Sequence, residues 1–214
     1  MTQIWWYLAR ASGIVAWLLL TASVLWGIFL STKLLQGLRR PAWLLDLHRW
    51  LGGLTVAFVG LHVASLIADS YVSFDLVDVL VPFASSWRPG AVALGVAAMW
   101  GLVAVELTSL AMRRLPRSVW RAVHLTSYLV FWATSLHAAL AGTDTASPLY
   151  IWTAVGSIIA VVFALTYRVL AGRGARARLD RPTSTAHTNT NTNTNTHTNT
   201  NTNDPTRPLV RSRS

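Results

Sequence analysis

Four histidines stand out because each lies in, or at the edge of, a segment made almost wholly of apolar residues. His48 and His62 bound the segment HRWLGGLTVAFVGLH, and His124 and His137 bound the segment HLTSYLVFWATSLH. Imidazole is a common metal ligand, and polar side chains at membrane depth are rare and usually functional. These residue types therefore favour ligation of a metal or of a metal-containing cofactor. The competing interpretation is hydrogen bonding between packed helices.

The spacing of the histidines divides them into two levels. On helices that rise about 1.5 Å per residue, roughly 21 Å separates His48 from His62, and roughly 20 Å separates His124 from His137. If the two helices run in the same direction, His48 and His124 share one level (the inner pair), and His62 and His137 share the other (the outer pair). One metal ion with bonds of about 2 Å cannot reach all four. Two imidazoles from facing helices do suit the two axial positions of a haem iron.

The thirteen-residue spacing conflicts with a straight helix. At about 100° per residue, fourteen residues nearly complete four turns, whereas thirteen fall short by roughly 140°. His124 and His137 would then lie on different faces of a straight helix. A tilt or a local bend between them is needed for both to face the same neighbour.

Five apolar runs could position these residues as membrane-spanning helices, since a span needs about 20 apolar residues. The chain is 53% hydrophobic and only 12% charged, which excludes an ordinary soluble domain. The predicted fold class is an all-α polytopic membrane helix bundle with about five transmembrane helices. The first run is too long for a signal peptide and is interpreted as a retained helix. The runs are approximately 4–31, 50–68, 91–112, 119–140 and 149–170.

Basic residues beside the apolar runs predict the orientation in the membrane. Cytoplasmic loops carry an excess of lysine and arginine, so the N-terminus is predicted outside and the C-terminus in the cytoplasm of a cell-membrane protein. The same pattern accounts for the net charge of +10 without a nucleic-acid partner, because no soluble domain remains to carry a basic patch. The three clusters are Lys33, Arg39, Arg40 and Arg49; Arg113, Arg114, Arg117 and Arg121; and Arg168, Arg173, Arg176, Arg178 and Arg181.

The composition divides the chain into two regions. Residues 1–172 form the predicted helix bundle, and residues 173–214 form a cytoplasmic tail of arginines followed by Thr-Asn repeats. Such a tract has nothing to bury and is predicted to be disordered. Cysteine is absent, so any haem would be held without covalent attachment.

The motif HRWLG, with a histidine fourteen residues after its own and a later pair thirteen residues apart, resembles the ferric reductase-like transmembrane domain. This superfamily includes ferric reductases, NADPH oxidases and the haem-bearing membrane subunit of bacterial methionine sulfoxide reductase systems. The resemblance covers roughly residues 5–170. It implies b-type haem and electron transfer across the membrane, with His48 and His124 ligating an inner haem and His62 and His137 an outer one. Arg49, next to His48, is the candidate partner for a haem propionate.

The chain departs from the family pattern in two respects. Many members have six helices, whereas five runs are found here. The larger reductases also carry a cytoplasmic flavin and nicotinamide module, and no G-x-G-x-x-G motif follows Arg173. No flavin or nicotinamide site is therefore expected in this chain, and the electron donor is predicted to be a separate cytoplasmic flavoprotein reductase or quinol.

The resulting hypothesis is a membrane b-type cytochrome that passes electrons through two bis-histidine haems to an acceptor outside. Two alternatives stay open: a single-haem member of the family, and a haem-free protein in contact with membrane lipid, either a metal permease or a packing subunit. Between His48 and His62 only Arg49 and Thr55 are polar. A segment with so few polar side chains favours a large apolar cofactor over the passage of a hydrated ion. The nearby glycines Gly52, Gly53 and Gly60 would let a flat macrocycle approach the backbone.

Overall fold

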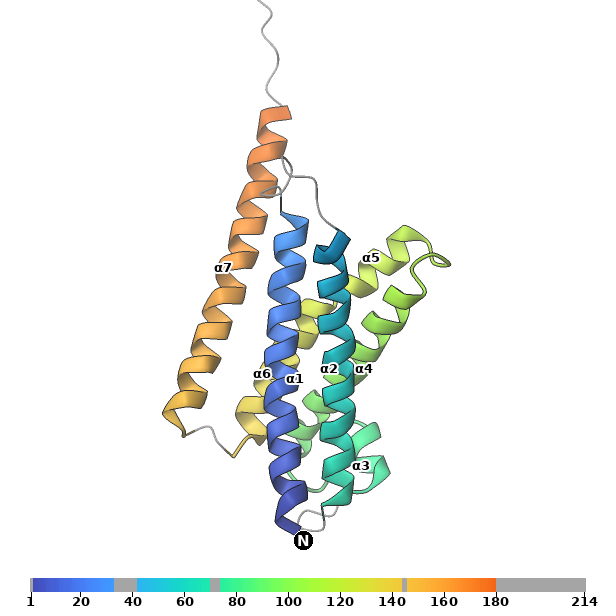
Figure 1. Cartoon of the computed structure of the whole chain (residues 1–214), viewed down its shortest axis with the longest axis vertical. Helices are drawn as coiled ribbons and strands as arrows, with labels where there is room; N and C mark the ends of the chain where they lie inside the picture. Colours follow the sequence, from blue (N-terminus) through green and yellow to red (C-terminus); the bar gives the residue numbers. More distant parts are fainter. Residues whose placement is uncertain (1, 33–41, 70–73, 144–145, 180–214) are drawn as a thin grey trace, which may run out of the picture. The chain divides into compact units, whose positions relative to one another are not determined.

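Every regular element in the described part of the chain is a helix. The computed structural model describes residues 2–32, 42–69, 74–143 and 146–179 (Figure 1). The all-α helix bundle predicted from the sequence is confirmed, while the Thr-Asn repeats and the residues Lys33, Arg39 and Arg40 lie outside the described residues. The helices are α1 (Thr2–Ser31), α2 (Ala42–Ala68), α3 (Leu76–Leu80), α4 (Pro89–Leu110), α5 (Arg117–Leu125), α6 (Ser127–Ala141) and α7 (Pro148–Leu179).

Four helices in the described ranges are long and apolar enough to cross a membrane. They contain 29, 27, 22 and 25 residues in the segments Gln3–Ser31, Ala42–Ala68, Pro89–Leu110 and Pro148–Gly172. Each agrees with a run expected from the sequence, although α2 begins eight residues earlier than its run and so places His48 inside a helix. The chain is therefore a multi-pass membrane protein.

The run expected at 119–140 is divided into two helices. The helix α5 ends at Leu125, Thr126 forms a turn, and α6 begins at Ser127. The 15 residues of α6 extend for only about 22 Å, which is less than a full span of the hydrocarbon core. The break falls between His124 and His137, where their thirteen-residue spacing requires a bend.

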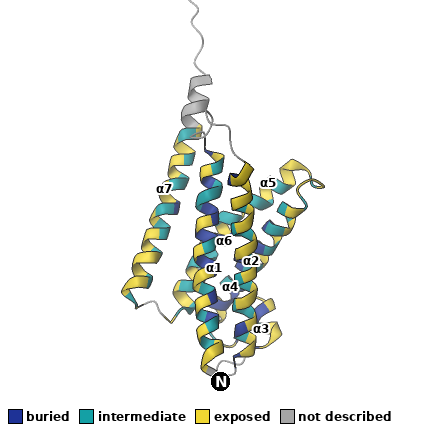
Figure 2. Cartoon of the chain, in the orientation of Figure 1, coloured by how far each residue is buried: buried dark blue, intermediate teal, exposed yellow. Residues whose placement is uncertain are grey.

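The helices pack in two antiparallel pairs, α1 along α2 and α4 along α6, and α7 packs against α1. Their shared core is made of aliphatic side chains and one aromatic ring. Figure 2 shows that exposed residues dominate α7 and much of α2, as expected for apolar helices that face lipid. The core residues are Leu20, Val24, Ile28, Ala98, Leu102, Val130, Phe131 and Val161.

Two buried hydroxyl groups on α2 are satisfied by their own helix. Thr55 donates to the carbonyl of Leu51 at 2.7 Å, and Ser65 donates to the carbonyl of Leu61 at 2.7 Å. This i to i−4 bond lets a polar residue lie at membrane depth without an unpaired donor.

Candidate functional site

The outer pair lines one cavity. His62 comes from α2 and His137 from α6, and both lie on the wall of a cavity of about 730 Å³. Cofactor sites commonly measure about 300–1,000 Å³ and are mostly apolar. The wall contains two charged residues, Arg10 and Asp69, and aliphatic residues from four helices, among them Leu20, Val59, Leu66, Val96, Leu102 and Val130.

Backbone carbonyls fix the protonation of both outer imidazoles. His62 Nδ1 lies 2.7 Å from the carbonyl oxygen of Ala9 on α1, and His137 Nδ1 lies 2.7 Å from that of Ala91 on α4. A carbonyl oxygen can only accept, so in each neutral ring Nδ1 carries the proton and donates it. The lone pair is then on Nε2, which is the tautomer that a metal-ligating histidine needs.

Glycines make room for the two outer rings. A Cβ atom placed on Gly13 of α1 would lie 3.0 Å from His62 Nδ1. One placed on Gly95 of α4 would lie 2.7 Å from both Nδ1 and Cε1 of His137. Each imidazole therefore lies directly against the backbone of a neighbouring helix. Any residue larger than glycine at these positions would displace it.

The inner pair meets face to edge. The ring centroids of His48 on α2 and His124 on α5 lie 6.0 Å apart, with an angle of 74° between the planes. Two imidazoles on opposite sides of one metal ion, with bonds of about 2 Å, place their centroids roughly 6 Å apart. The separation of His48 and His124 is therefore suited to the two opposite axial positions of one iron.

Serine hydroxyls take the place of carbonyls at the inner pair. Ser23 Oγ lies 3.4 Å from His48 Nδ1, and Ser109 Oγ lies 3.4 Å from His124 Nδ1. Ser109 already donates its own proton to the carbonyl of Val105 at 2.7 Å, so it accepts from His124. On the other side, Trp120 stacks on His124 with centroids 5.1 Å apart.

The donor set fits a haem better than a bare ion. In the described part of the chain, no group of three or more histidine, cysteine, aspartate or glutamate side chains is arranged to hold a metal ion. The imidazoles come in pairs, and a pair is complete only when a macrocycle supplies the remaining ligands. The volume and the mostly apolar wall of the outer cavity also suit a porphyrin.

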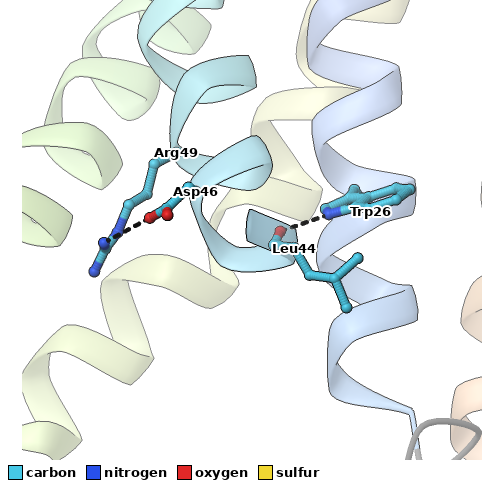
Figure 3. A network of polar contacts seen from close by, with 4 residues as sticks. All are labelled: Trp26, Leu44, Asp46 and Arg49. Carbon is cyan, nitrogen blue, oxygen red and sulfur yellow. Dashed lines mark hydrogen bonds and ion pairs between the residues drawn. The ribbon is translucent and has the colours of Figure 1, made fainter. Parts of the chain in front are cut away.

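Arg49 lies apart from the outer cavity. Its guanidinium donates to Asp46 at 3.3 Å on the same exposed side of α2 (Figure 3). Figure 3 also shows Trp26 of α1 reaching the carbonyl of Leu44, to which its Nε1 donates at 2.8 Å. This bond ties the start of α2 to α1 one turn before His48. The role of Arg49 toward a propionate stays a prediction.

The glycines that contact the histidine rings differ from those singled out from the sequence, whose role toward a macrocycle stays a prediction. A Cβ on Gly53 or Gly60 would meet nothing within 4 Å, and one on Gly52 would meet Glu106 Oε2 at 2.9 Å. The glycines that contact the rings are Gly13, Gly27 and Gly95. One signal was present in the sequence: Gly13 and Gly27 are fourteen residues apart, like His48 and His62 on the helix that packs against them.

Comparison with known proteins identifies a family. The family model described as ferric reductase like transmembrane component matches residues 12–135, which is 124 of the 214 residues. The match includes Gly13, His48, His62 and His124, and it ends two residues before His137. No curated protein matches the chain, and no solved structure matches it.

Proposed function

The chain belongs to the ferric reductase-like transmembrane component family, and from this premise we propose that it carries electrons across a membrane through two b-type haems. His48 and His124 hold the inner haem, and His62 and His137 hold the outer one. Family membership supports the membrane electron-transfer role. The ligand assignment rests on the pairing of the four rings in the structure.

One observation carries the proposal: each of the four paired imidazoles has its Nδ1 next to an oxygen atom of a side chain or backbone on a neighbouring helix. The oxygen atoms belong to Ala9 and Ala91 for the outer pair and to Ser23 and Ser109 for the inner pair. Such second-shell bonds orient a ligand and raise its basicity. They leave each Nε2 available for an iron atom.

When bound, haem supplies one-electron redox chemistry at its iron. The protein supplies the rest. The four imidazoles orient the two macrocycles, and the core around Phe131 supplies an apolar surrounding between the levels. The wall residue Arg10, which also stacks over Trp6 at 5.5 Å, offers a guanidinium to a propionate of the outer haem.

The proposed path runs outward. A cytoplasmic flavoprotein reductase or quinol delivers electrons at the inner pair, and an acceptor outside receives them from the outer pair. The N-terminus is then outside, and the C-terminus is in the cytoplasm. This orientation follows from the arginines near the inner end of the bundle, including Arg113, Arg114, Arg117 and Arg121, together with the positive-inside rule.

A one-haem protein is the competing arrangement, and the position of the cavity favours one pair for it. The 730 Å³ cavity is lined by His62 and His137, and its wall includes neither His48 nor His124. The two outer imidazoles also make the shorter Nδ1 bonds, 2.7 Å against 3.4 Å. A single haem would therefore occupy the outer pair.

The test is haem stoichiometry in the full chain, purified in nanodiscs after expression with ample haem supply. Haem per chain is measured by pyridine haemochrome, together with oxidised and dithionite-reduced spectra. We expect two haems in the wild type and one in each of the variants His48→Ala, His62→Ala, His124→Ala and His137→Ala. Wild-type protein that folds without haem would overturn the proposal. One haem, lost only with His62→Ala and His137→Ala, would establish the competing arrangement.

A further inference from the structure

Three of the four imidazoles are held by the same short unit on a neighbouring helix. In each unit, a glycine faces the ring, and the group that meets Nδ1 lies four residues before the glycine. Ala9 and Gly13 hold His62, Ser23 and Gly27 hold His48, and Ala91 and Gly95 hold His137. We propose that these units, here called ring seats, are positioning residues that fix the rotation of each axial imidazole and thereby tune the haem it ligates. The inference rests on the proposed function.

The four-residue spacing gives each seat its geometry. Residues four apart on a helix lie one turn apart on the same face, and small residues at this spacing let another helix approach closely. The oxygen therefore restrains Nδ1, while the bare glycine backbone lies against the ring. With both restraints on one helix, the rotation of the ring is limited.

The contacts at the three glycines rank the seats by tightness. A Cβ on Gly95 would lie 2.7 Å from Nδ1 and Cε1 of His137 and 3.1 Å from Cγ. One on Gly13 would lie 3.0 Å from His62 Nδ1, and one on Gly27 would lie 3.2 Å from His48 Cε1. Carbon atoms in favourable contact are about 3.5–4.0 Å apart. Adding a methyl group must therefore rotate the ring or lengthen its Nδ1 bond, most of all at Gly95.

The fourth imidazole is held differently. His124 lies on α5 and meets the hydroxyl of Ser109, but its flat side is covered by Trp120 instead of a glycine. Trp120 lies on the same helix, one turn before His124. The inner haem would thus have one seated ligand and one stacked ligand, whereas the outer haem would have two seated ligands.

The seats would act on a bound haem through the ring. Hydrogen bonding at Nδ1 would change the basicity of Nε2 and so the relative stability of ferric and ferrous iron. The rotation of the ring would affect the splitting of the iron d orbitals. Both effects can be measured without any turnover, as the midpoint potential and as the g values of the low-spin ferric signal.

The experiment compares glycine-to-alanine variants of the full haem-loaded chain in nanodiscs. Gly95→Ala and Gly13→Ala are expected to shift the g values and midpoint potential of the outer haem only, with the larger shift for Gly95→Ala. Gly27→Ala is expected to shift those of the inner haem only. Ser23→Ala removes an acceptor without adding bulk and is expected to raise the midpoint potential of the inner haem.

Matched control variants distinguish the effect of a changed ring seat from that of crowding elsewhere in the bundle. Gly101→Ala lies on the same helix as Gly95 and would also create a 2.7 Å approach, but to Val130 Cγ2 and not to an imidazole. Gly156→Ala, on α7, meets open space. Gly156→Ala should keep the wild-type g values, and Gly101→Ala should change those of the outer haem less than Gly95→Ala does. If Gly95→Ala removes the outer haem altogether while the inner haem and the Gly101→Ala protein stay intact, the seat is also supported.

Two results would overturn the inference. One is a Gly95→Ala protein with full haem content and wild-type g values and potentials. The other is a Gly101→Ala protein that changes the outer haem as much as Gly95→Ala does. Failure of the proposed function is recognised separately, because wild-type protein would then contain no haem before any variant is compared.

Discussion

His48 and His124 lie 6.0 Å apart, centroid to centroid, with their rings inclined at 74°, although one belongs to a long spanning helix and the other to the short helix α5. Nearly perpendicular imidazoles leave two of the iron d orbitals close in energy. We therefore expect the inner haem to show a strongly anisotropic ferric EPR signal at low field. Loss of that signal in His124→Ala, with the other haem signal retained, would assign it. A low-field signal that survives in both His48→Ala and His124→Ala would contradict the assignment.

The hydroxyl of Ser109 offers a second prediction. Ser109→Ala leaves the Nδ1 proton of His124 without the acceptor seen at 3.4 Å, and loss of such a partner usually lowers metal-site affinity about 10–100-fold. Inner haem should be released more readily when the protein is challenged with apomyoglobin. Thr108→Ala is the matched control, because the Thr108 hydroxyl bonds only to carbonyls of its own helix. Equal release from both variants would exclude a specific role for Ser109.

Substitution of Arg49 is expected to change the midpoint potential of the inner haem in a defined direction. A cation near a haem stabilises the reduced form, so Arg49→Gln should lower the midpoint potential of the inner haem if the guanidinium acts on that haem. Asp46 partly neutralises this charge at 3.3 Å, so Asp46→Asn should raise the same potential. Spectroelectrochemical titration measures both. If the midpoint potentials of the two variants change in the same direction, or do not change, Arg49 acts only in setting the orientation of the chain in the membrane.

Phe131 is the aromatic residue at the centre of the core, with no exposed surface. Phe131→Ala should lower the thermal stability of the bundle markedly, since burial losses of this kind cost about 3–5 kcal/mol in well-packed proteins. Phe163→Ala is the control, because 72% of Phe163 is exposed on α7. Static light scattering during heating in detergent compares the two. Equal unfolding temperatures would show that Phe131 is not a packing centre.

Trp17 links α1 to α6 close to the outer pair. Its Nε1 donates to Ser135 Oγ at 3.1 Å, two residues before His137. Trp17→Phe keeps the ring but loses the donor, which should cost about 0.5–1.5 kcal/mol, seen as a small drop in the unfolding temperature of the haem-loaded protein. Trp152→Phe, at a position that is 75% exposed, should be neutral. A larger effect at Trp152 would argue against the assignment of α7 to the lipid-facing side.

The sequence predicted the fold class because length and hydropathy suffice to define spanning helices. It also placed the histidines in two levels, because the rise of a helix converts spacing into depth. The break at Thr126 could not be located, since the residues from Leu125 to Ser127 include neither proline nor glycine and the apolar run continues through them. Only the thirteen-residue spacing required a bend. The early start of α2 was hidden by Asp46, which interrupts the hydropathy near its first turn.

The residues that contact the four imidazoles were harder to predict, because these contacts depend on how neighbouring helices are aligned along their length. The glycines near His48 and His62 in the sequence lie on α2 itself, whereas the glycines that contact those rings lie on α1. Such contacts become apparent only when α1 and α2 are aligned antiparallel. Their equal fourteen-residue spacings then bring Gly27 beside His48 and Gly13 beside His62.

Helix α1 contributes no histidine, yet it touches one imidazole of each pair through Gly13 and Gly27. One continuous helix therefore positions one imidazole of the inner pair and one of the outer pair. A single residue inserted between these two glycines would turn everything beyond it by about 100° and advance it by about 1.5 Å. Either Gly13 could then stay beside His62 or Gly27 beside His48, but not both. The number of residues between the two glycines is therefore constrained like the histidines themselves.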